Sequence, residues 1–319
     1  MRLLWGRLGC RPVGSHGRGL GGLWLLSVLA GAALFGDSAA LDAEEYSAYS
    51  DPEKPVLSVI LSEERNVEEL AKRFDLSDEE VENVLAAVRK ENEALAQEYG
   101  ESERIVASNR GLSDEEVARK IAASGYHEEV RSAVAATKGE VEAILPEDQS
   151  ADLESWVDGQ WSQEVKEAST EESAEVVRTK SGRRKLRCKV FATQYHGYTR
   201  YEAALPHRKL KFGNKPRVRI RRVNHSRVVR PRVKEVGPWN TYDNYWATRK
   251  HRTMWKKLRR CTPEAQAAYY NNFNNGRDEF GRKVLNPAGV DLTPRAARGL
   301  GLRKYQNAWV YVRFPWIRR

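Results

Sequence analysis

The stretch that decides the fold is residues 233–240, VKEVGPWN, where Glu235 stands two residues before a Gly-Pro turn. Acidic side chains are scarce around it, since residues 176–319 contain 37 Lys and Arg but only 7 Asp and Glu. A single carboxylate at a turn within a strongly basic segment is the best candidate for chemistry in this sequence. The alternative is structural: Glu235 neutralises a basic neighbour such as Arg232 or accepts a hydrogen bond from a loop amide.

The rest of the chain has the opposite charge. Residues 41–175 contain 36 acidic and 13 basic side chains, so the net charge of +10 conceals two oppositely charged halves. A length of 319 residues also favours two domains over one. We therefore expect an acidic domain followed by a basic one, and the basic one requires an anionic partner: nucleic acid, an anionic lipid surface or an anionic wall polymer.

The N-terminal residues indicate export. An arginine-containing region without acids precedes an apolar run at residues 20–36, and small residues follow at 37–40. This order is typical of a signal peptide, residues 1–40, cleaved after Ala40, with no stable membrane span remaining in the mature protein. The alternatives are an uncleaved signal anchor and an organellar transit peptide. We expect a secreted protein of the extracytoplasmic cell envelope.

Cysteine usage is consistent with export. Only Cys188 and Cys261 follow the predicted signal peptide. In an oxidising compartment they can pair, closing a long loop and stabilising the fold by about 4 kcal/mol; the alternative is two buried, unpaired thiols. No metal-binding or cofactor-binding motif is present, so we expect neither a metal nor a cofactor.

Residues 56–145 have the pattern of an acidic helical domain. The hexapeptide LSDEEV occurs at residues 76–81 and again at 112–117. In each copy the serine can cap a helix while the glutamate three residues later reaches back, which is a capping box. We expect a small bundle of four or five short helices, with helix ends near Gly100, Gly111, Gly125 and Gly139. Residues 41–55 are expected to be flexible, and residues 146–185 to form a linker with transient helices.

Nucleic-acid binding is not expected. Residues 69–81 are similar to a helix-turn-helix, but the second helix would begin with acidic side chains, which DNA phosphates repel. Aromatic and basic residues of the second half suit single-stranded nucleic acid. That hypothesis requires the N-terminus not to be a signal peptide.

Residues 186–319 contain short strand patterns. The clearest lie at residues 188–195, 217–223, 227–233 and 309–314, and Asn224 to Ser226 form a hairpin-like link. Residues 293–300 are expected to form a short helix with Pro294 in its first turn. The pattern alone predicts a small β-rich domain.

Three blocks in this half resemble the RlpA-like (rare lipoprotein A) family. They are residues 207–213 (HRKLKFG), 235–238 (EVGP) and 291–301 (DLTPRAARGLG), in the order of the family's His-x-x-Leu-x-Phe-Gly, Asp-x-Gly-Pro and Asp-Leu-Ser blocks. The resemblance covers about residues 186–316. It implies an α+β protein of two domains, in which residues 186–319 form a six-stranded double-psi β-barrel with a long inserted loop.

The resemblance also implies a function. The family's enzymatic members are lytic transglycosylases, so we expect the barrel to bind peptidoglycan glycan strands. Whether it also cleaves them is left open by the sequence. Glu235 would then act as general acid/base assisted by His207, because one acid suffices when a cyclic sugar forms. The family has Asp where this chain has Glu235, and a carboxyl displaced by about 1.5 Å can cost about 100-fold in rate. For His207 the alternative is a hydrogen-bonded histidine of the barrel.

The inserted loop supplies the predicted substrate-binding residues. Aromatic faces stack on sugar rings, and asparagine offers sugar hydroxyls both a donor and an acceptor. The predicted set is Trp239, Asn240, Tyr242, Tyr245, Trp246 and Asp291. An equal alternative makes the aromatic residues an inserted mini-core, and Asp291 is alternatively a helix cap or loop anchor. The rival function is a non-catalytic module that binds an anionic wall polymer through its basic surface.

Overall fold

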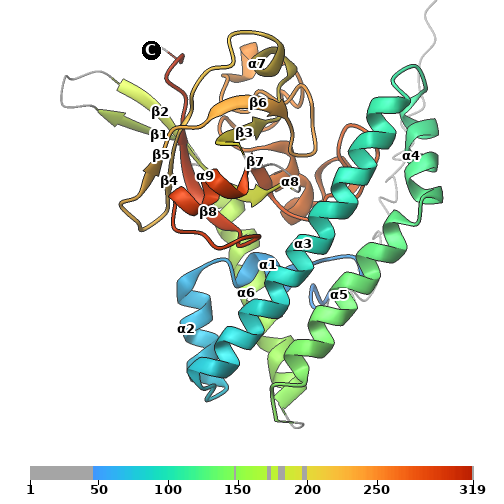
Figure 1. Ribbon diagram of the computed structural model, residues 1–319, viewed down its shortest axis with the longest axis vertical. Coiled ribbons are helices and arrows are strands. Elements are labelled where there is room, and N and C mark those ends of the chain that lie inside the picture. The colour runs from blue at the N-terminus through green and yellow to red at the C-terminus, as the bar shows by residue number, and fades with distance from the viewer. Residues whose placement is uncertain (1–45, 147–148, 171–173, 179–183, 196–199, 318–319) are drawn as a thin grey trace, which may run out of the picture. The chain divides into compact units, whose positions relative to one another are not determined.

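A computed structural model describes residues 46–146, 149–170, 174–178, 184–195 and 200–317. The predicted signal peptide and residues 41–45 of the segment predicted to be flexible lie outside these ranges. Residues 46–55 of that segment are described, and Ala48 and Tyr49 are buried there. Residues Ser47–Arg319 form one compact unit. It combines a helical N-terminal region with a C-terminal mixed sheet, which is the expected α+β class (Figure 1).

In the described part of the chain, six helices precede the sheet. They are α1 (Val56–Ile60), α2 (Glu64–Arg73), α3 (Asp78–Ser108), α4 (Asp114–Ala123), α5 (Tyr126–Glu142) and α6 (Ser150–Thr170). Both predicted capping boxes are confirmed, since Ser77 and Ser113 each accept a hydrogen bond from the backbone of a glutamate that bonds back to the serine N–H. These caps fix where α3 and α4 begin.

Two predictions about these helices were wrong. Gly100 lies inside the 31-residue helix α3, and Gly139 lies inside α5. One interior glycine costs only about 1 kcal/mol relative to alanine, which is less than the packing gained by the buried apolar face of α3. Residues expected to form a linker contain the 21-residue helix α6, because Leu153, Trp156 and Trp161 are buried along one side of it.

The described residues contain eight strands in one mixed sheet, where six were expected. They are β1 (Ala174–Arg178), β2 (Arg184–Gln194), β3 (Glu202–Leu205), β4 (Arg219–Arg222), β5 (Val228–Val229), β6 (Arg232–Val236), β7 (Ala288–Leu292) and β8 (Ala308–Arg313). The order is β5-β4-β8-β2-β7-β3-β6, and β1 pairs with β2. The pairs β2–β7 and β3–β6 are parallel, whereas the other pairs are antiparallel.

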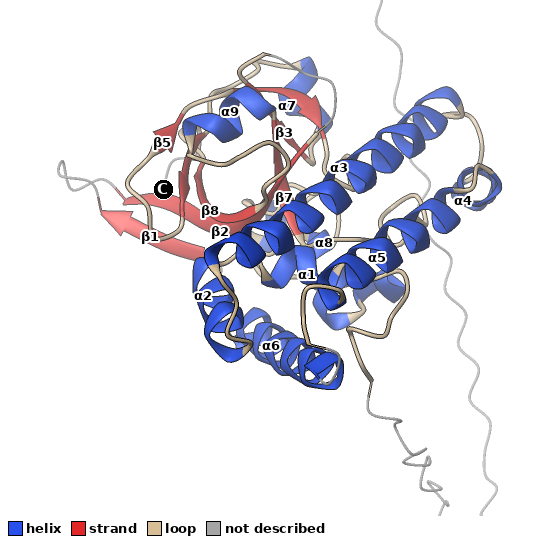
Figure 2. Ribbon diagram, turned by 60° about the horizontal axis from the view of Figure 1, so that its bottom comes forward, coloured by secondary structure: helices blue, strands red, loops and turns tan. Residues whose placement is uncertain are grey.

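The two ends of this strand order are also in contact. A bridge joins Arg217, just before β4, to Arg232 at the start of β6. Beside it, Val218 N donates to Pro231 O at 3.1 Å and Val233 N donates to Pro216 O at 2.9 Å. Figure 2 shows the strands curving around one another, with the short helices α7 (Arg208–Phe212) and α9 (Pro294–Gly299) at their ends.

The helices and the sheet share a hydrophobic core. One buried cluster joins the helical region to Phe191 of β2, Ala288 of β7 and Tyr269 of α8 (Glu264–Asn271). In both ribbon views α3 lies between the strands and α5 (Figure 1, Figure 2).

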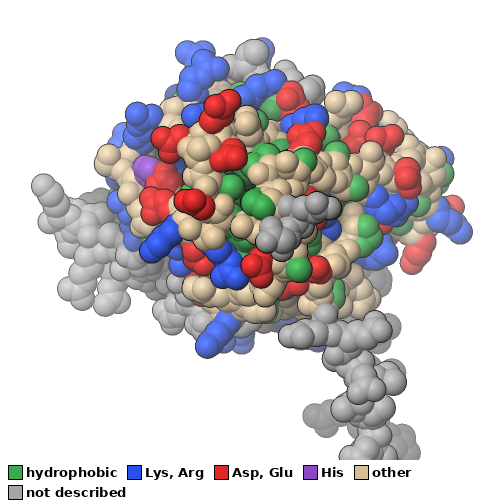
Figure 3. Space-filling model, turned by 90° about the horizontal axis from the view of Figure 1, so that it is seen from below, with side chains coloured by type: hydrophobic (Ala, Val, Ile, Leu, Met, Phe, Trp, Pro, Cys, Tyr) green, Lys and Arg blue, Asp and Glu red, His purple; other side chains and the backbone are tan. Residues whose placement is uncertain are grey.

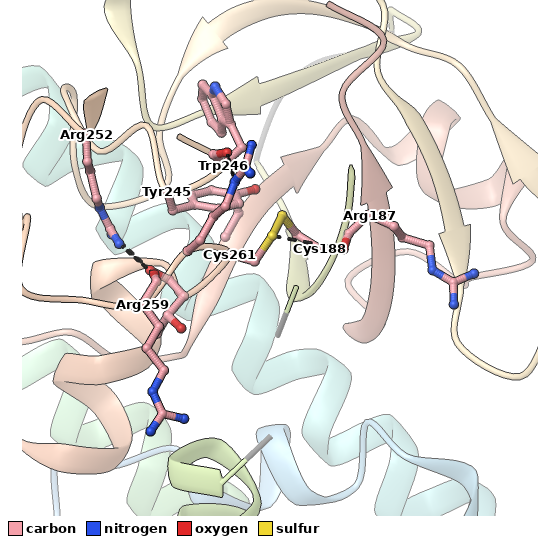
Figure 4. The surroundings of a disulfide bond; sticks show 10 residues. Arg187, Cys188, Tyr245, Trp246, Arg252, Arg259 and Cys261 are labelled. Carbon is pink, nitrogen blue, oxygen red and sulfur yellow. Dashed lines mark hydrogen bonds between the residues drawn. A yellow bond between two sulfur atoms is a disulfide. The ribbon is translucent and has the colours of Figure 1, made fainter. Parts of the chain in front are cut away.

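A second buried cluster lies within the sheet region and includes Cys188 of β2 and Cys261. The predicted disulfide between these two cysteines is confirmed, with their Cα atoms 5.1 Å apart. Figure 4 shows Tyr245 and Trp246 beside this bond, with the Arg187 guanidinium turned away.

The opposite charges of the two halves meet where α3 packs on the sheet region. Arg282 is 1 % exposed and donates to Asp278 at 2.6 Å, to Glu103 of α3 at 2.6 Å and to the Trp239 carbonyl at 2.8 Å. An exposed pair, Lys304 with Glu93 of α3, lies 2.8 Å apart. Acidic and basic side chains are interspersed on the face seen in Figure 3. The charge asymmetry of the sequence is therefore partly neutralised within the fold.

We predict that Arg282→Met lowers the free energy of unfolding by about 3–5 kcal/mol, because it leaves Asp278 buried without its cation. Lys304→Met removes an exposed pair of the same type and should cost less than about 1 kcal/mol. Urea unfolding followed by circular dichroism measures both. Equal losses in the two variants would contradict a central role for Arg282.

Candidate functional site

A hollow of about 770 Å³ contains the residue that the sequence singled out, Glu235. Its lining comes from two parts of the chain: α3 with the beginning of α4, and the strand ends β3, β6 and β7 with the inserted loop. The lining includes Tyr99, Ala204, Lys211, Glu235, Tyr242 and Asp291.

Four residues on neighbouring strands form one rung of the sheet. Thr193 of β2 is the register partner of Asp291 of β7, which pairs with Ala204 of β3, which pairs with Glu235 of β6. Register partners point to the same face of a sheet, so the two carboxyl groups face the hollow on either side of the Ala204 methyl group. Their strands are two apart, about 10 Å between backbones.

A β-bulge sets this register. Ala203 pairs with Val233 but Ala204 pairs with Glu235, so Lys234 is the extra residue on β6. Without it, Lys234 would take the place of Glu235 beside Ala204. Bulges commonly re-aim a side chain in this way next to functional sites.

Asp291 is the buried carboxyl of the pair. It is 5 % exposed, and its Oδ1 accepts a hydrogen bond from the Thr193 hydroxyl. Burial raises the pKa of Asp291 to about 7, against the lowering effect of the Thr193 bond. Asp291 therefore retains a proton over much of the acidic range and is a candidate proton donor. It does not cap α9, because Thr293 makes that cap by accepting from Ala296 N.

Glu235 is the more accessible carboxyl. Its side chain is 29 % exposed, and its Oε2 lies 2.5 Å from Nζ of Lys211 in α7. The basic neighbour that compensates it is therefore Lys211 and not Arg232, which donates to the Lys215 carbonyl. The pair remains open to the hollow, since both side chains line it.

His207 does not join Glu235 in the hollow. It is 6 % exposed, lies 6.0 Å from the Trp246 ring centroid, and has Nε2 3.4 Å from the Thr253 hydroxyl. Burial, then the charge of Lys209, lowers the pKa of His207, so the neutral form is favoured. This environment fits the alternative of a hydrogen-bonded structural histidine.

Of the predicted aromatic and asparagine contacts, only Tyr242 is exposed, at 38 %, and it lines the hollow. Trp239, Asn240, Tyr245 and Trp246 are all less than 5 % exposed. The Asn240 amide donates to Glu264 at 2.6 Å, and the Tyr245 hydroxyl donates to the Gly289 carbonyl at 2.9 Å. These four residues fit the mini-core alternative.

Three residues of the site were not predicted from the sequence. Lys211 lies within the HRKLKFG block and Thr193 near the end of the first strand pattern, so both belong to segments that the sequence patterns identify. Tyr99 of α3 also lines the hollow. No feature of the sequence predicts Tyr99 as a site residue, because the helical pattern does not indicate which residue of a long helix contacts a distant strand.

The described residues contain no group of three His, Cys, Asp or Glu side chains placed to hold a metal ion. In the same part of the chain, no helix combines the length and hydropathy that a membrane crossing requires.

Residues 172–313 match the family described as "Domain of unknown function (DUF8814)". No curated protein and no solved structure matches the chain. The matched range contains the whole rung and Lys211, but it does not contain α3, which supplies much of the remaining lining of the hollow.

We predict that the free energy of unfolding falls as pH rises from about 4 to about 7, because folded Asp291 keeps a proton that the unfolded chain, with a pKa near 3.8, has lost. Asp291→Asn should abolish this contribution and stabilise the protein relative to wild type by up to about 4 kcal/mol at pH 8, with little effect at pH 4. Urea unfolding at several pH values measures the difference. The exposed Asp75→Asn is the control, and parallel profiles for wild type and Asp291→Asn would refute the shift.

Proposed function

We propose that this protein is an exported bacterial envelope protein whose C-terminal region is an RlpA-like double-psi β-barrel that binds and cleaves peptidoglycan glycan strands. The observation that carries the proposal is the rung that sets Asp291 and Glu235 on one face of the sheet, in a hollow with the exposed Tyr242. This arrangement offers a glycan two carboxyl groups of different character and an aromatic face.

The strand pairing supports the barrel. Two parallel pairs, β2–β7 and β3–β6, are joined through the antiparallel contact between β3 and β7. The Arg217–Arg232 bridge brings the ends of the strand order together, as closure of a barrel requires. The acidic helices α2 to α6 then form a bundle that packs on this barrel through the core they share.

The two carboxyl groups suit a lytic transglycosylation. Protonated Asp291 donates its proton to the glycosidic oxygen as the bond from that oxygen to the sugar carbon breaks. A hydroxyl group of the same sugar forms the new bond to that carbon, and its proton passes to Glu235. The products are a cyclic sugar end and a shortened strand, and no water is consumed. Lys211 holds Glu235 in position for this transfer.

We expect the full-length wild-type protein to release cyclic sugar ends from stem-peptide-free glycan strands. Glu235→Gln and Asp291→Asn should each lower the rate by about 100-fold or more, because each removes a proton-transfer group. Mass spectrometry identifies the product, which lacks one water relative to a hydrolysis product. The exposed Glu79→Gln is the control. Equal release by wild type and Glu235→Gln, or none by any form, would reject the catalytic proposal.

A specific observation favours the second candidate, adhesion to an anionic wall polymer. Arg187, Arg313 and Arg219 are register partners across β2, β8 and β4, and Tyr311 and Arg221 are partners on an adjacent rung. Like charges opposite one another destabilise a sheet, and burial, then the charges of Arg219 and Arg230, lowers the pKa of Arg313. Over the described ranges, no carboxylate forms an ion pair with Arg219, Arg221 or Arg313. Bound phosphodiester groups would relieve this repulsion.

For this second function we predict that changing Arg219, Arg221 and Arg313 together to Gln weakens binding to poly(glycerol phosphate) by tenfold or more and reduces its salt dependence. The control carries the same charge change at Arg65, Arg73 and Arg119 of the helical region. Binding isotherms at low and high salt measure the effect. Equal weakening in both triple variants would indicate attraction by net charge alone.

A further inference from the structure

Tyr99 lies about two-thirds of the way along α3, where the helix passes the Gly-Pro turn. Its hydroxyl oxygen accepts a hydrogen bond from Trp239 N at 2.8 Å, and its ring lies 4.9 Å from the Trp239 ring. Tyr99 therefore contacts the turn that follows Glu235, although more than a hundred residues separate the two in sequence.

The Tyr99 hydroxyl and Asp291 face the same point. A Cβ placed on Gly237, whose φ of +133° favours glycine, would lie 3.4 Å from the Tyr99 hydroxyl and 3.9 Å from Asp291 Oδ2. Thr193 occupies the other oxygen of Asp291, Oδ1. The Tyr99 hydroxyl and Asp291 Oδ2, the oxygen that Thr193 does not bond, therefore both lie beside Gly237.

The hydrogen bond from Trp239 leaves the Tyr99 proton free for another acceptor. A tyrosine hydroxyl can accept and donate at once, and here its oxygen accepts from the backbone. Burial, then the charge of Glu103, raises the pKa of Tyr99 well above its ordinary value. The neutral hydroxyl, which can donate a hydrogen bond, is therefore the favoured form.

Arg282 fixes Tyr99 in this position. Its guanidinium lies 4.9 Å from the Tyr99 ring and bonds both Glu103, one turn further along α3, and the Trp239 carbonyl. Both backbone polar groups of Trp239 are thus held, one by Tyr99 and one by Arg282. Such support keeps a side chain in the orientation that a binding site needs.

The rest of the hollow indicates a ligand that touches both parts of the chain. Large hydrophobic side chains are exposed at only three of the described positions, and two of them, Leu112 and Tyr242, line this hollow. Leu112 lies between α3 and α4, whereas Tyr242 belongs to the inserted loop. Exposed apolar surface on two parts of one hollow is typical of a binding site.

We infer that α3 is part of the glycan-binding site and that Tyr99 is a positioning residue, whose hydroxyl donates a hydrogen bond to the sugar lying over Asp291. This inference rests on the proposed function. It gives the helical region a direct part in substrate recognition, and it means that the range matched by the family, 172–313, does not contain the complete site.

The test uses full-length protein and stem-peptide-free glycan strands. We expect Tyr99→Phe, which keeps the ring and loses the hydroxyl, to lower kcat/KM by about tenfold, and Leu112→Ser, on the surface, to raise KM several-fold. Binding is measured separately by calorimetry in the Glu235→Gln background. There, each change should weaken the affinity for the glycan by a factor similar to its effect on the kinetic constant. Tyr126→Phe is the matched control, since the buried Tyr126 hydroxyl has no hydrogen-bond partner among the residues that the structure describes. Leu112→Met, which keeps an apolar side chain at this position, should leave the KM at the wild-type value.

The outcomes separate the two proposals. If wild type binds and cleaves the glycan while Tyr99→Phe and Leu112→Ser behave as wild type does, this inference is overturned and the proposed function stands. If wild type neither binds nor cleaves, the proposed function fails and the inference fails with it. Urea unfolding of each variant shows whether a loss of binding follows from a loss of folding: a loss of affinity that tracks unfolding at the assay temperature overturns the inference.

Discussion

The buried guanidinium of Arg282 is the interaction on which the arrangement depends. Burying a cation is costly unless carboxylates and hydrogen-bond acceptors surround it, and Arg282 has Asp278, Glu103 and the Trp239 carbonyl. One of these partners is on α3 and another follows the Gly-Pro turn. The Arg282 guanidinium, whose burial these partners compensate, therefore also fixes the helical region against the residues that follow Glu235. The acidic half is therefore a structural complement of the basic half as well as its neighbour in sequence.

Local signals predicted local structure well. The capping boxes, the strand patterns at residues 188–195 and 309–314 and the helix beginning at Pro294 each depend on a few adjacent residues, and each is present in the structure. The pattern at residues 227–233 was predicted as one strand, but it is divided between β5 and the start of β6. Gly100 and Gly139 were poor guides, because tertiary packing outweighs the small cost of a glycine inside a helix. The disulfide was predicted from the number of cysteines and the expected compartment, but the closeness of Cys188 and Cys261 comes from the pairing of distant segments.

The site was predictable only in part, for a related reason. The sequence singled out Glu235, Tyr242 and Asp291, and all three line the hollow. It assigned Trp246 and Tyr245 to the same surface, yet composition does not distinguish aromatic residues that stack on a ligand from those that fill a core. It also had no means of predicting that a bulge at Lys234 aligns Glu235 with Ala204 and Asp291. Register across parallel strands is a non-local property.

The rung also explains how two carboxyl groups on one face acquire different properties. Asp291 lies on β7, which has a strand on each side, and its charged form is disfavoured by burial, so its pKa rises to about 7. Glu235 lies on β6, at the end of the strand order, where α7 brings Lys211 to it. The buried carboxyl, Asp291, thus lies on a central strand. The more exposed carboxyl, Glu235, lies on an end strand, where the positive charge of Lys211 is beside it. Strand position thus gives the two carboxyl groups different surroundings. The helix α3 adds to those of Asp291, because Tyr99 and the charge of Glu103 are part of the environment in which Asp291 titrates.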